Sequence, residues 1–394
     1  MSFDFQCVVD RTATNAEKYT LRQKLFKTEE VLPMWVADMD IETPPCIVSA
    51  VQKRAAHPLY GYEEVPQSAY EAQIEWMKKR HGFEMKREWM FYSHSVVATI
   101  NTVIHAFTKP GDKVIVQTPI YPPFLSNVTR NGREVLRNPL HRSEDGDYTF
   151  DLDDLRSKID EDTKLLLLCS PHNPVGRVWS HKELQALADI CLEHNIKVVA
   201  DEIHSDLVYA PYRHIPFASL SEEVANITVT AIGPGKTFNT AGLAISTVVV
   251  QNDQMREAFD DAYERIHFAQ GNVFAHAGFE AAYREGEQWL DELLIHLQRN
   301  IEKLKSLAQS HSDKIRFIEP QGTYLAWLDC SGLGLSSSEL KRFFVEEAAL
   351  GLSPGVSFGK EGKGYMRLNF AVAGPIMDDA IAQLDLALSN FDEY

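Results

Sequence analysis

The chain has 394 residues, a length typical of two domains, with a third possible. Apolar residues make up 44% and charged residues 24% of it, which excludes a disordered chain, a collagen-like repeat and a disulfide-held miniprotein. The 39 basic and 56 acidic residues give a net charge of −17. Such a surface repels phosphate backbones and anionic lipid, so we expect neither nucleic acid nor membrane as a partner.

The helical and strand periods alternate from about residue 43 onward. Four segments have the apolar spacing of amphipathic helices, and the first opens with two prolines, which the first turn of a helix tolerates. These predicted helices cover residues 43–57, 67–81, 95–108 and 180–194. Five short segments rich in β-branched or leucine residues predict strands at 113–118, 164–169, 197–201, 227–230 and 243–250.

Two of the predicted strands contain unbroken apolar runs, at 165–168 and 248–250. Residues Leu165 to Leu168 show no alternation between apolar and polar side chains, which is typical of strands covered on both faces. Repeated strand–helix–strand units therefore predict an α/β fold with a mainly parallel sheet flanked by helices.

The pattern changes after about residue 280, where a long helical segment precedes shorter strands and two more helices. The predicted helices are 286–309, 337–349 and 375–390, and the predicted strands are 314–318, 323–327 and 364–370. We expect a large domain at 43–280 and a small α+β domain at 281–394. The N-terminal segment, 1–42, is expected to pack with the small domain.

The cysteines indicate the compartment. They are widely spaced, odd in number and form no CxxC pair, which is typical of reduced thiols and indicates neither a disulfide framework nor a zinc site. The first fifteen residues have no apolar core of the signal-peptide kind, and no run of 18 apolar residues is present. We therefore expect a cytoplasmic protein.

Polar side chains follow three of the predicted strands. Asn173 follows the strand that ends at Cys169, Asp201 ends the next and is followed by His204, and Lys236 follows the third. Because reactive groups collect beyond the C-terminal ends of strands in open α/β sheets, one pocket can hold all four.

Each of these groups also has other interpretations. Gly235-Lys236-Thr237 resembles the end of a phosphate-binding loop, but Thr230 stands where that motif needs glycine. A lysine in a glycine turn is either solvated or buried and able to form a Schiff base. Asp201 with His204 lacks a nearby second His or Cys for a metal, so we expect no metal site. A carboxylate at a strand end otherwise caps a helix or pairs with a cation.

The order of these residues along the chain is more specific than any one of them. The ordered set is Tyr121, Asn173-Pro-x-Gly, Asp201 with His204, Lys236 and Arg367. With the segments 32–40, 60–62, 201–207 and 236–243, it resembles the fold-type I pyridoxal-phosphate (PLP) enzymes of the class I/II aminotransferase superfamily. More narrowly, it resembles their cystathionine β-lyase/C–S lyase branch (the MalY/PatB group), over nearly the whole chain. The resemblance implies a large PLP-binding domain with a mainly parallel seven-stranded sheet, and a smaller α+β domain.

The resemblance also implies roles at the cofactor ring. Lys236 would bind PLP as a Schiff base and then move the substrate's α-proton. Asp201 would pair with the pyridine nitrogen, keeping it protonated so that the ring accepts electrons. Asn173 and His204 would donate to the phenolic oxygen, and Tyr121 would stack on the ring. The alternatives are a turn asparagine, a satisfied core histidine and ordinary aromatic packing.

Further roles concern the phosphate and the substrate. The helix that begins after Ser95 would offer the N–H groups of Val96 and Val97 to the phosphate. Tyr62 would reach the phosphate of a neighbouring subunit, which implies a homodimer. Arg367 would bind the carboxylate of an amino-acid substrate, unless it forms a surface salt bridge. Trp35 and Tyr324 are expected to shape the pocket for the substrate's side chain.

One position departs from the family pattern. Relatives usually have a hydroxyl residue immediately before the lysine, whereas this chain has Gly235. One expected phosphate contact is therefore missing or is made by a backbone N–H, which puts the affinity for the cofactor in question.

The composition and spacing of the residues do not determine which of two reactions the enzyme catalyses. Loss of the α-proton leads either to transamination with a 2-keto acid or to elimination from Cβ, which yields a thiol, pyruvate and ammonia. The resemblance around Trp35 and His204 favours the C–S lyase. Because some members of this branch bind a transcription regulator, a regulatory role without catalysis is a third hypothesis. An intact set of Lys236, Asp201 and Arg367 favours an enzyme.

Overall fold

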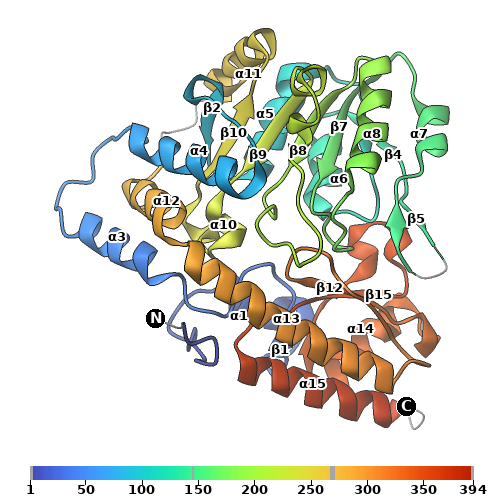
Figure 1. The fold of residues 1–394 in the computed structure, drawn as a ribbon. Helices are drawn as coiled ribbons and strands as arrows, with labels where there is room; N and C mark the ends of the chain where they lie inside the picture. The colour runs from blue at the N-terminus through green and yellow to red at the C-terminus, as the bar shows by residue number, and fades with distance from the viewer. Residues whose placement is uncertain (1–2, 144–145, 267–270, 392–394) are drawn as a thin grey trace.

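The computed structural model describes residues 3–143, 146–266 and 271–391 (Figure 1). Its main feature is a seven-stranded sheet with the strand order β2-β10-β9-β8-β7-β3-β4. The strands are β2 (Met90–Ser93), β3 (Lys113–Val116), β4 (Glu134–Arg137), β7 (Thr163–Cys169), β8 (Lys197–Asp201), β9 (Thr228–Ile232) and β10 (Ser246–Val250). The five strands from β4 to β9 run parallel, and β10 is antiparallel to both its neighbours. The predicted α/β fold with a mainly parallel sheet is confirmed.

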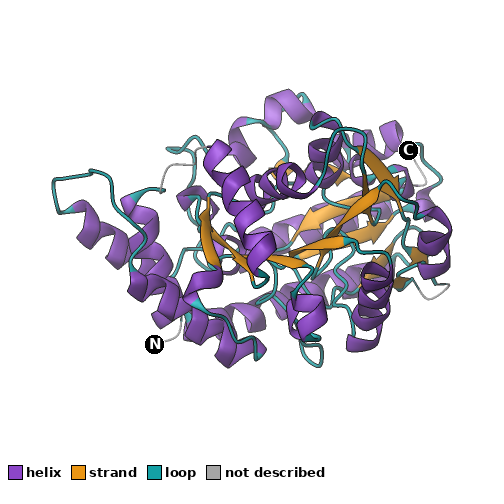
Figure 2. Cartoon of the chain, turned by 90° about the horizontal axis from the view of Figure 1, so that it is seen from above, coloured by secondary structure: helices purple, strands orange, loops and turns teal. Residues whose placement is uncertain are grey.

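Both faces of this sheet are covered, as the missing alternation predicts. Leu166 and Leu168 of β7 pack in one apolar cluster with α8 (His181–Glu193), whereas Leu165 and Leu167 pack in another with α5 (Val96–Phe107). Figure 2 shows helices on both sides of the strands. Ser180 and Glu183 begin α8 with a reciprocal capping box, so two of its free N–H groups are satisfied.

A smaller antiparallel sheet follows in the chain, with the order β11-β12-β15-β14. Its strands are β11 (Arg316–Ile318), β12 (Leu325–Asp329), β14 (Ser353–Pro354) and β15 (Tyr365–Asn369). The long helix α13 (Glu287–Ser310) and the helix α15 (Gly374–Ser389) lie side by side below it (Figure 1). A short parallel pair joins β1 (Leu32–Pro33) to β13 (Leu350–Gly351), so the N-terminal segment contacts this unit. The boundary at residue 280 stays a prediction.

Several predicted boundaries agree with the structure, and others shift for a local reason. Helix α4 (Gln67–His81) has the predicted bounds, because Gly82 adopts φ of 64° and ends it in a left-handed cap. The strand predicted from residue 243 begins at Ser246, since residues 241–243 form a 3₁₀ turn.

Other elements carry no clear period in the sequence or were predicted with slightly different ends. The remaining helices are α1 (Glu17–Thr20), α2 (Arg22–Phe26), α3 (Pro45–Ala55), α6 (Pro122–Arg130), α7 (Leu152–Lys158), α9 (Glu222–Ala225), α10 (Pro234–Thr237), α11 (Asp253–Ile266), α12 (Val273–Glu285) and α14 (Ser337–Glu346). The remaining strands are β5 (His141–Arg142) and β6 (Tyr148–Thr149), which pair with each other. None of the described helices combines the length and the apolar character needed to cross a bilayer.

Candidate active site

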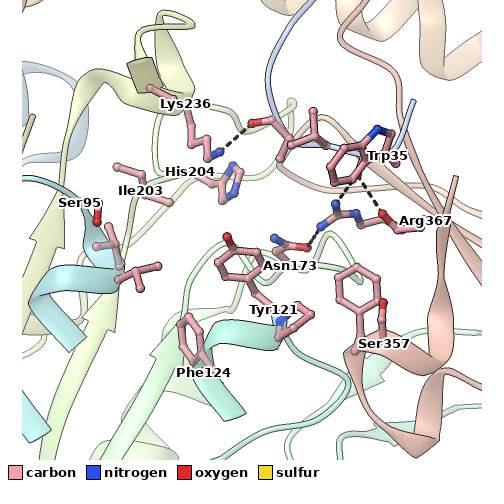
Figure 3. A pocket seen from close by; sticks show the side chains of 18 of the residues that line it. Trp35, Ser95, Tyr121, Phe124, Asn173, Ile203, His204, Lys236, Ser357 and Arg367 are labelled. Atoms are coloured by element: carbon pink, nitrogen blue, oxygen red, sulfur yellow. Dashed lines mark hydrogen bonds between the residues drawn. The ribbon is translucent and has the colours of Figure 1, made fainter. Parts of the chain in front are cut away.

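The parallel strands bring the predicted polar groups to one edge of the large sheet. A cavity of about 590 Å³ lies there, within the range of ligand-binding pockets, and Figure 3 shows the side chains that border it. The predicted residues that line the cavity are Trp35, Val96, Val97, Tyr121, Asn173, Asp201, His204, Lys236 and Arg367. Residues from both ends of the chain therefore meet at this sheet edge.

Lys236 lies on α10, a single helical turn that directly follows β9, instead of in the flexible glycine turn expected from the sequence. Its Nζ donates a hydrogen bond of 2.6 Å to the carbonyl of Ala37. Burial and the nearby charge of Arg367 lower the pKa of Lys236 to about 8, although the carboxylates of Asp38 and Asp201 oppose this shift. Roughly a tenth of the amine is thus uncharged at about pH 7, far more than for an ordinary lysine, and the uncharged amine is the form that acts as a nucleophile or a base.

Asp201 ends β8 and is buried, with no cation in ion-pair distance among the described residues. Its Oδ1 accepts a hydrogen bond of 3.1 Å from the Ile203 N–H. Burial raises the pKa of Asp201 to about 7, and the Ile203 N–H and the charge of Lys236 only partly offset this. A cation placed in the cavity beside Asp201 would stabilise its charged form.

Asp206, five residues further on in the same loop, is a buried aspartate whose carboxylate has hydrogen-bond partners within the protein. Its carboxylate accepts hydrogen bonds from Trp76 at 3.0 Å and Thr237 at 2.9 Å, and lies 2.8 Å from His81. Burial acts to raise the pKa of Asp206, but these partners hold it below its usual value. The contrast indicates that the missing partner of Asp201 belongs to a ligand.

Arg367 on β15 is a buried cation without a carboxylate partner in the described part of the chain. It donates to Asn173 Oδ1 at 3.1 Å and to the Trp35 carbonyl at 2.7 Å, as the dashed lines in Figure 3 mark. Its guanidinium lies 4.7 Å from the ring centre of Phe358, and within the described residues its Nε has no hydrogen-bond partner. Burial lowers the pKa of Arg367 to about 10. This fixed and incompletely paired guanidinium suits a carboxylate ligand.

His204 is buried near the cavity and stays neutral. Burial, helped by the charges of Lys236 and Arg367, lowers its pKa to about 3, and its Nδ1 has no hydrogen-bond partner among the residues that the structure describes. Asn173 Nδ2 makes no hydrogen bond within the described residues either. Two neutral nitrogen groups thus remain available for an oxygen of a ligand.

Tyr121 and Tyr324, both predicted at the site, take different positions. Tyr121 borders the cavity at the start of α6, and burial raises its pKa. Tyr324 is not among the described residues that line the cavity. Its hydroxyl instead donates to the Ala37 carbonyl at 2.9 Å, and its ring centre lies 5.9 Å from that of His204. Tyr324 therefore supports lining residues from behind.

The N-terminus of α5 offers two free donors to the cavity. Ser95 Oγ accepts a hydrogen bond from the Ala98 N–H at 3.2 Å, whereas the N–H groups of Val96 and Val97 have no partner among the described residues. Helix N-termini of this kind attract anions. Gly235 also borders the cavity, and a Cβ built on it would lie no closer than 3.6 Å to a neighbouring atom, the Cα of Ala241.

Tyr62 lies outside the cavity of its own chain. It is fully exposed, on the connection between α3 and α4 that projects from the body of the molecule (Figure 1). Within one chain, Tyr62 therefore does not join the other predicted residues.

The sequence did not single out several residues that the structure brings to the cavity. Ile203, two residues beyond Asp201, lines it, and its position directly after a strand end was the only available signal. Glu17, Leu25, Phe26 and Lys341 line it as well, from α1, α2 and α14. These four carry no local motif, because only the packing of distant helices places them there.

The comparisons with known proteins agree with this geometry. The family described as Aminotransferase class I and II matches residues 29–383. The chain belongs to this family. It is 40% identical over 390 residues to "Cystathionine beta-lyase PatB" of Bacillus subtilis, covering 99% of this chain and all of that protein.

Two solved structures are similar over almost the full length. A PLP-bound putative aminotransferase from Clostridium difficile has a TM-score of 0.96 and 41% identity, covering 98% of this chain and all of that one. A PLP-bound C–S lyase from Staphylococcus hominis has a TM-score of 0.90 and 31% identity, covering 98% and 99%. The chain is a PLP-dependent enzyme of the C–S lyase branch.

The residues present fit this cofactor. The unpaired carboxylate of Asp201 matches a protonated ring nitrogen, and the free N–H groups of Val96 and Val97 match a phosphate. The amine of Lys236 lies in the same cavity. No cluster of three or more His, Cys, Asp or Glu side chains suited to a metal ion is present among the described residues.

Proposed function

We propose that this enzyme eliminates the sulfur substituent from L-cystathionine or a related L-cysteine S-conjugate, releasing a thiol, pyruvate and ammonia. The observation that carries the proposal is one cavity bordered by a lysine amine of lowered pKa, an unpaired carboxylate and an unpaired guanidinium. The 40% identity to a protein named as a cystathionine β-lyase supports this reaction over others of the family.

When bound, PLP supplies an aldehyde that reacts with an amine and a pyridinium ring that withdraws electrons from the substrate's α-carbon. Lys236 Nζ is the amine for that aldehyde and afterwards the base that accepts the α-proton. The Ala37 carbonyl orients Nζ through the 2.6 Å hydrogen bond. The carboxylate of Asp201 would pair with the protonated ring nitrogen, and Asn173 and His204 would donate hydrogen bonds to the ring oxygen.

Arg367 orients the substrate by its α-carboxylate. Two of its N–H groups are held by Asn173 Oδ1 and the Trp35 carbonyl, so the guanidinium plane is fixed before the substrate enters. Tyr121 and Ile203 both line the cavity, where Tyr121 would stack on the cofactor ring and Ile203 would offer it an apolar contact. Trp35 then borders the leaving group.

We further propose that the enzyme works as a homodimer in the cytoplasm. The projecting connection between α3 and α4 presents Tyr62 to a second subunit, which explains why an aromatic side chain is left fully exposed. All five cysteines are free, as a reducing compartment favours. The proposed division into a segment at 1–42 and domains at 43–280 and 281–394 follows the two sheets.

Incubating the purified enzyme with L-cystathionine, with and without a 2-keto acid, tests the reaction. Release of pyruvate and thiol without the keto acid is expected. Strict dependence on the keto acid would instead show a transaminase, the alternative suggested by the 41% identity to a putative aminotransferase. Bound PLP with neither reaction on any S-conjugate would leave the regulatory role.

A further inference from the structure

The cavity extends beyond the predicted catalytic groups to a second wall, which we call the outer wall. It consists of the lining residues from α1, α2 and α14 together with two from the segment around β14: Glu17, Leu25, Phe26, Lys341, Leu352 and Pro354. Four of these side chains are apolar, and the other two carry opposite charges. The substituent on the substrate's sulfur is the part of the substrate that meets such a wall.

The outer wall is held in place by buried ion pairs. Lys18, which neighbours Glu17 in α1, is fully buried and lies 3.0 Å from Asp38 and 2.8 Å from Asp40. Arg11 pairs with the same two carboxylates at 2.9 and 2.7 Å. The cluster is electrically balanced, and Asp38 directly follows Ala37, whose carbonyl accepts from Lys236. These ion pairs anchor α1, and with it Glu17, to the segment that contacts Lys236.

Glu17 is exposed and has no cation within ion-pair distance among the described residues. Its charge is close enough to Tyr121 to add to the burial that raises the pKa of that hydroxyl. The carboxylate of Glu17 thus affects the hydroxyl of Tyr121, which borders the cavity. The two cations beside Glu17, Lys18 and Arg11, are paired with Asp38 and Asp40, so they do not neutralise its charge.

Lys341 is the positively charged residue of the outer wall and is partly buried. Its Nζ donates a hydrogen bond of 2.8 Å to the Leu25 carbonyl and lies 5.8 Å from the ring centre of Phe26. No carboxylate pairs with it in the described chain. Because an ammonium group has three N–H donors, two remain for a ligand.

We infer that the outer wall is a subsite for a second amino-acid group at the far end of the sulfur substituent. Glu17 binds its ammonium, Lys341 binds its carboxylate, and the carbon chain between lies against Leu25 and Phe26. This rests on the proposed C–S cleavage and narrows its substrates to conjugates with two α-amino acid ends, such as L-cystathionine. An uncharged alkyl substituent would contact the same apolar atoms but leave both charges unpaired.

The test compares L-cystathionine with S-butyl-L-cysteine, which lacks the distal charges. For Lys341→Met and for Glu17→Gln, kcat/KM for pyruvate release from L-cystathionine should fall about tenfold, mainly through KM, because a charge-assisted hydrogen bond is lost. For S-butyl-L-cysteine it should stay within about twofold, since no such bond is lost there. Lys341→Arg should restore most of the loss. Lys24→Met and Glu29→Gln, exposed neighbours outside the cavity, are the matched controls.

Equal effects on the two substrates, or no effect on either, would overturn the subsite. A wild-type enzyme that releases pyruvate from neither substrate would contradict the proposed function instead. In that case binding tests the subsite separately. Each compound is titrated into the enzyme, and the change in the visible absorption of bound PLP gives its half-saturating concentration. Lys341→Met must raise that concentration about tenfold for L-cystathionine alone, and any other result overturns the inference.

Discussion

Replacing Asp201 by asparagine should stabilise the cofactor-free protein above neutral pH, although it removes a residue proposed to be essential. In the folded chain the pKa of Asp201 is raised from 3.8 to about 7 by burial. Between these two values the folded state keeps a proton that the unfolded state has lost, so each pH unit lowers the stability of the wild type relative to the variant. At one pKa unit per 1.36 kcal/mol, the relative gain of Asp201→Asn is about 2 kcal/mol at about pH 5 and about 4 kcal/mol at about pH 8.

Urea unfolding of the cofactor-free proteins at these two pH values measures the difference. The advantage of Asp201→Asn over the wild type should grow by about 2–3 kcal/mol from the lower to the higher pH. Asp206→Asn is the matched control, because Asp206 is equally buried in the same loop but fully hydrogen-bonded. It should be less stable than the wild type by about 1–3 kcal/mol at the higher pH. If the stability advantage of Asp201→Asn does not grow with pH, Asp201 is not a buried carboxylate with a raised pKa, and the reasoning is wrong.

Two further predictions concern the ligands. Arg367→Ala should raise KM for the amino-acid substrate by about 10- to 150-fold, the equivalent of about 1.5–3 kcal/mol for a charge-assisted contact. Arg156→Ala, at the exposed ion pair with Glu193, is the control and should leave KM unchanged. An unchanged KM for Arg367→Ala would show that Arg367 does not bind the substrate. Gly235→Ser should fold and slow the loss of PLP on dilution, because its Cβ meets no atom closer than 3.6 Å. Gly233→Ser should lower stability, because its Cβ would lie 2.9 Å from that of Ser246, and equal behaviour of the two variants would contradict this packing.

The large sheet could be predicted because its signals are local. Unbroken runs such as Leu165 to Leu168 indicate strands covered on both faces, and the caps at Ser180 and Gly82 fix two helix ends. The edge strands β2 and β4 have only four residues each, so their period does not distinguish them from loops.

The inner part of the candidate site was also predictable, because its residues follow consecutive parallel strands. The structure places Asn173, Asp201, His204 and Lys236 on one cavity, whereas their roles remain proposals. Tyr324 lies behind the cavity lining, with its hydroxyl on the Ala37 carbonyl and its ring beside His204, and its role in the side-chain pocket stays a prediction.

The outer wall was not predictable from the sequence. Glu17 lies on a helix of four residues and Lys341 on a helix more than 300 residues away, and no spacing rule connects them. The ion pairs of Lys18 with Asp38 and Asp40 anchor α1, whereas Lys341 is held by its hydrogen bond to the Leu25 carbonyl.

Reduction of the yellow holoenzyme with borohydride, followed by peptide mapping, tests the central assignment most directly. We expect one reduced PLP adduct, on the peptide that contains Lys236, and none in Lys236→Ala, which should keep its fold and lose turnover. An adduct on another lysine, or none at all, would contradict it.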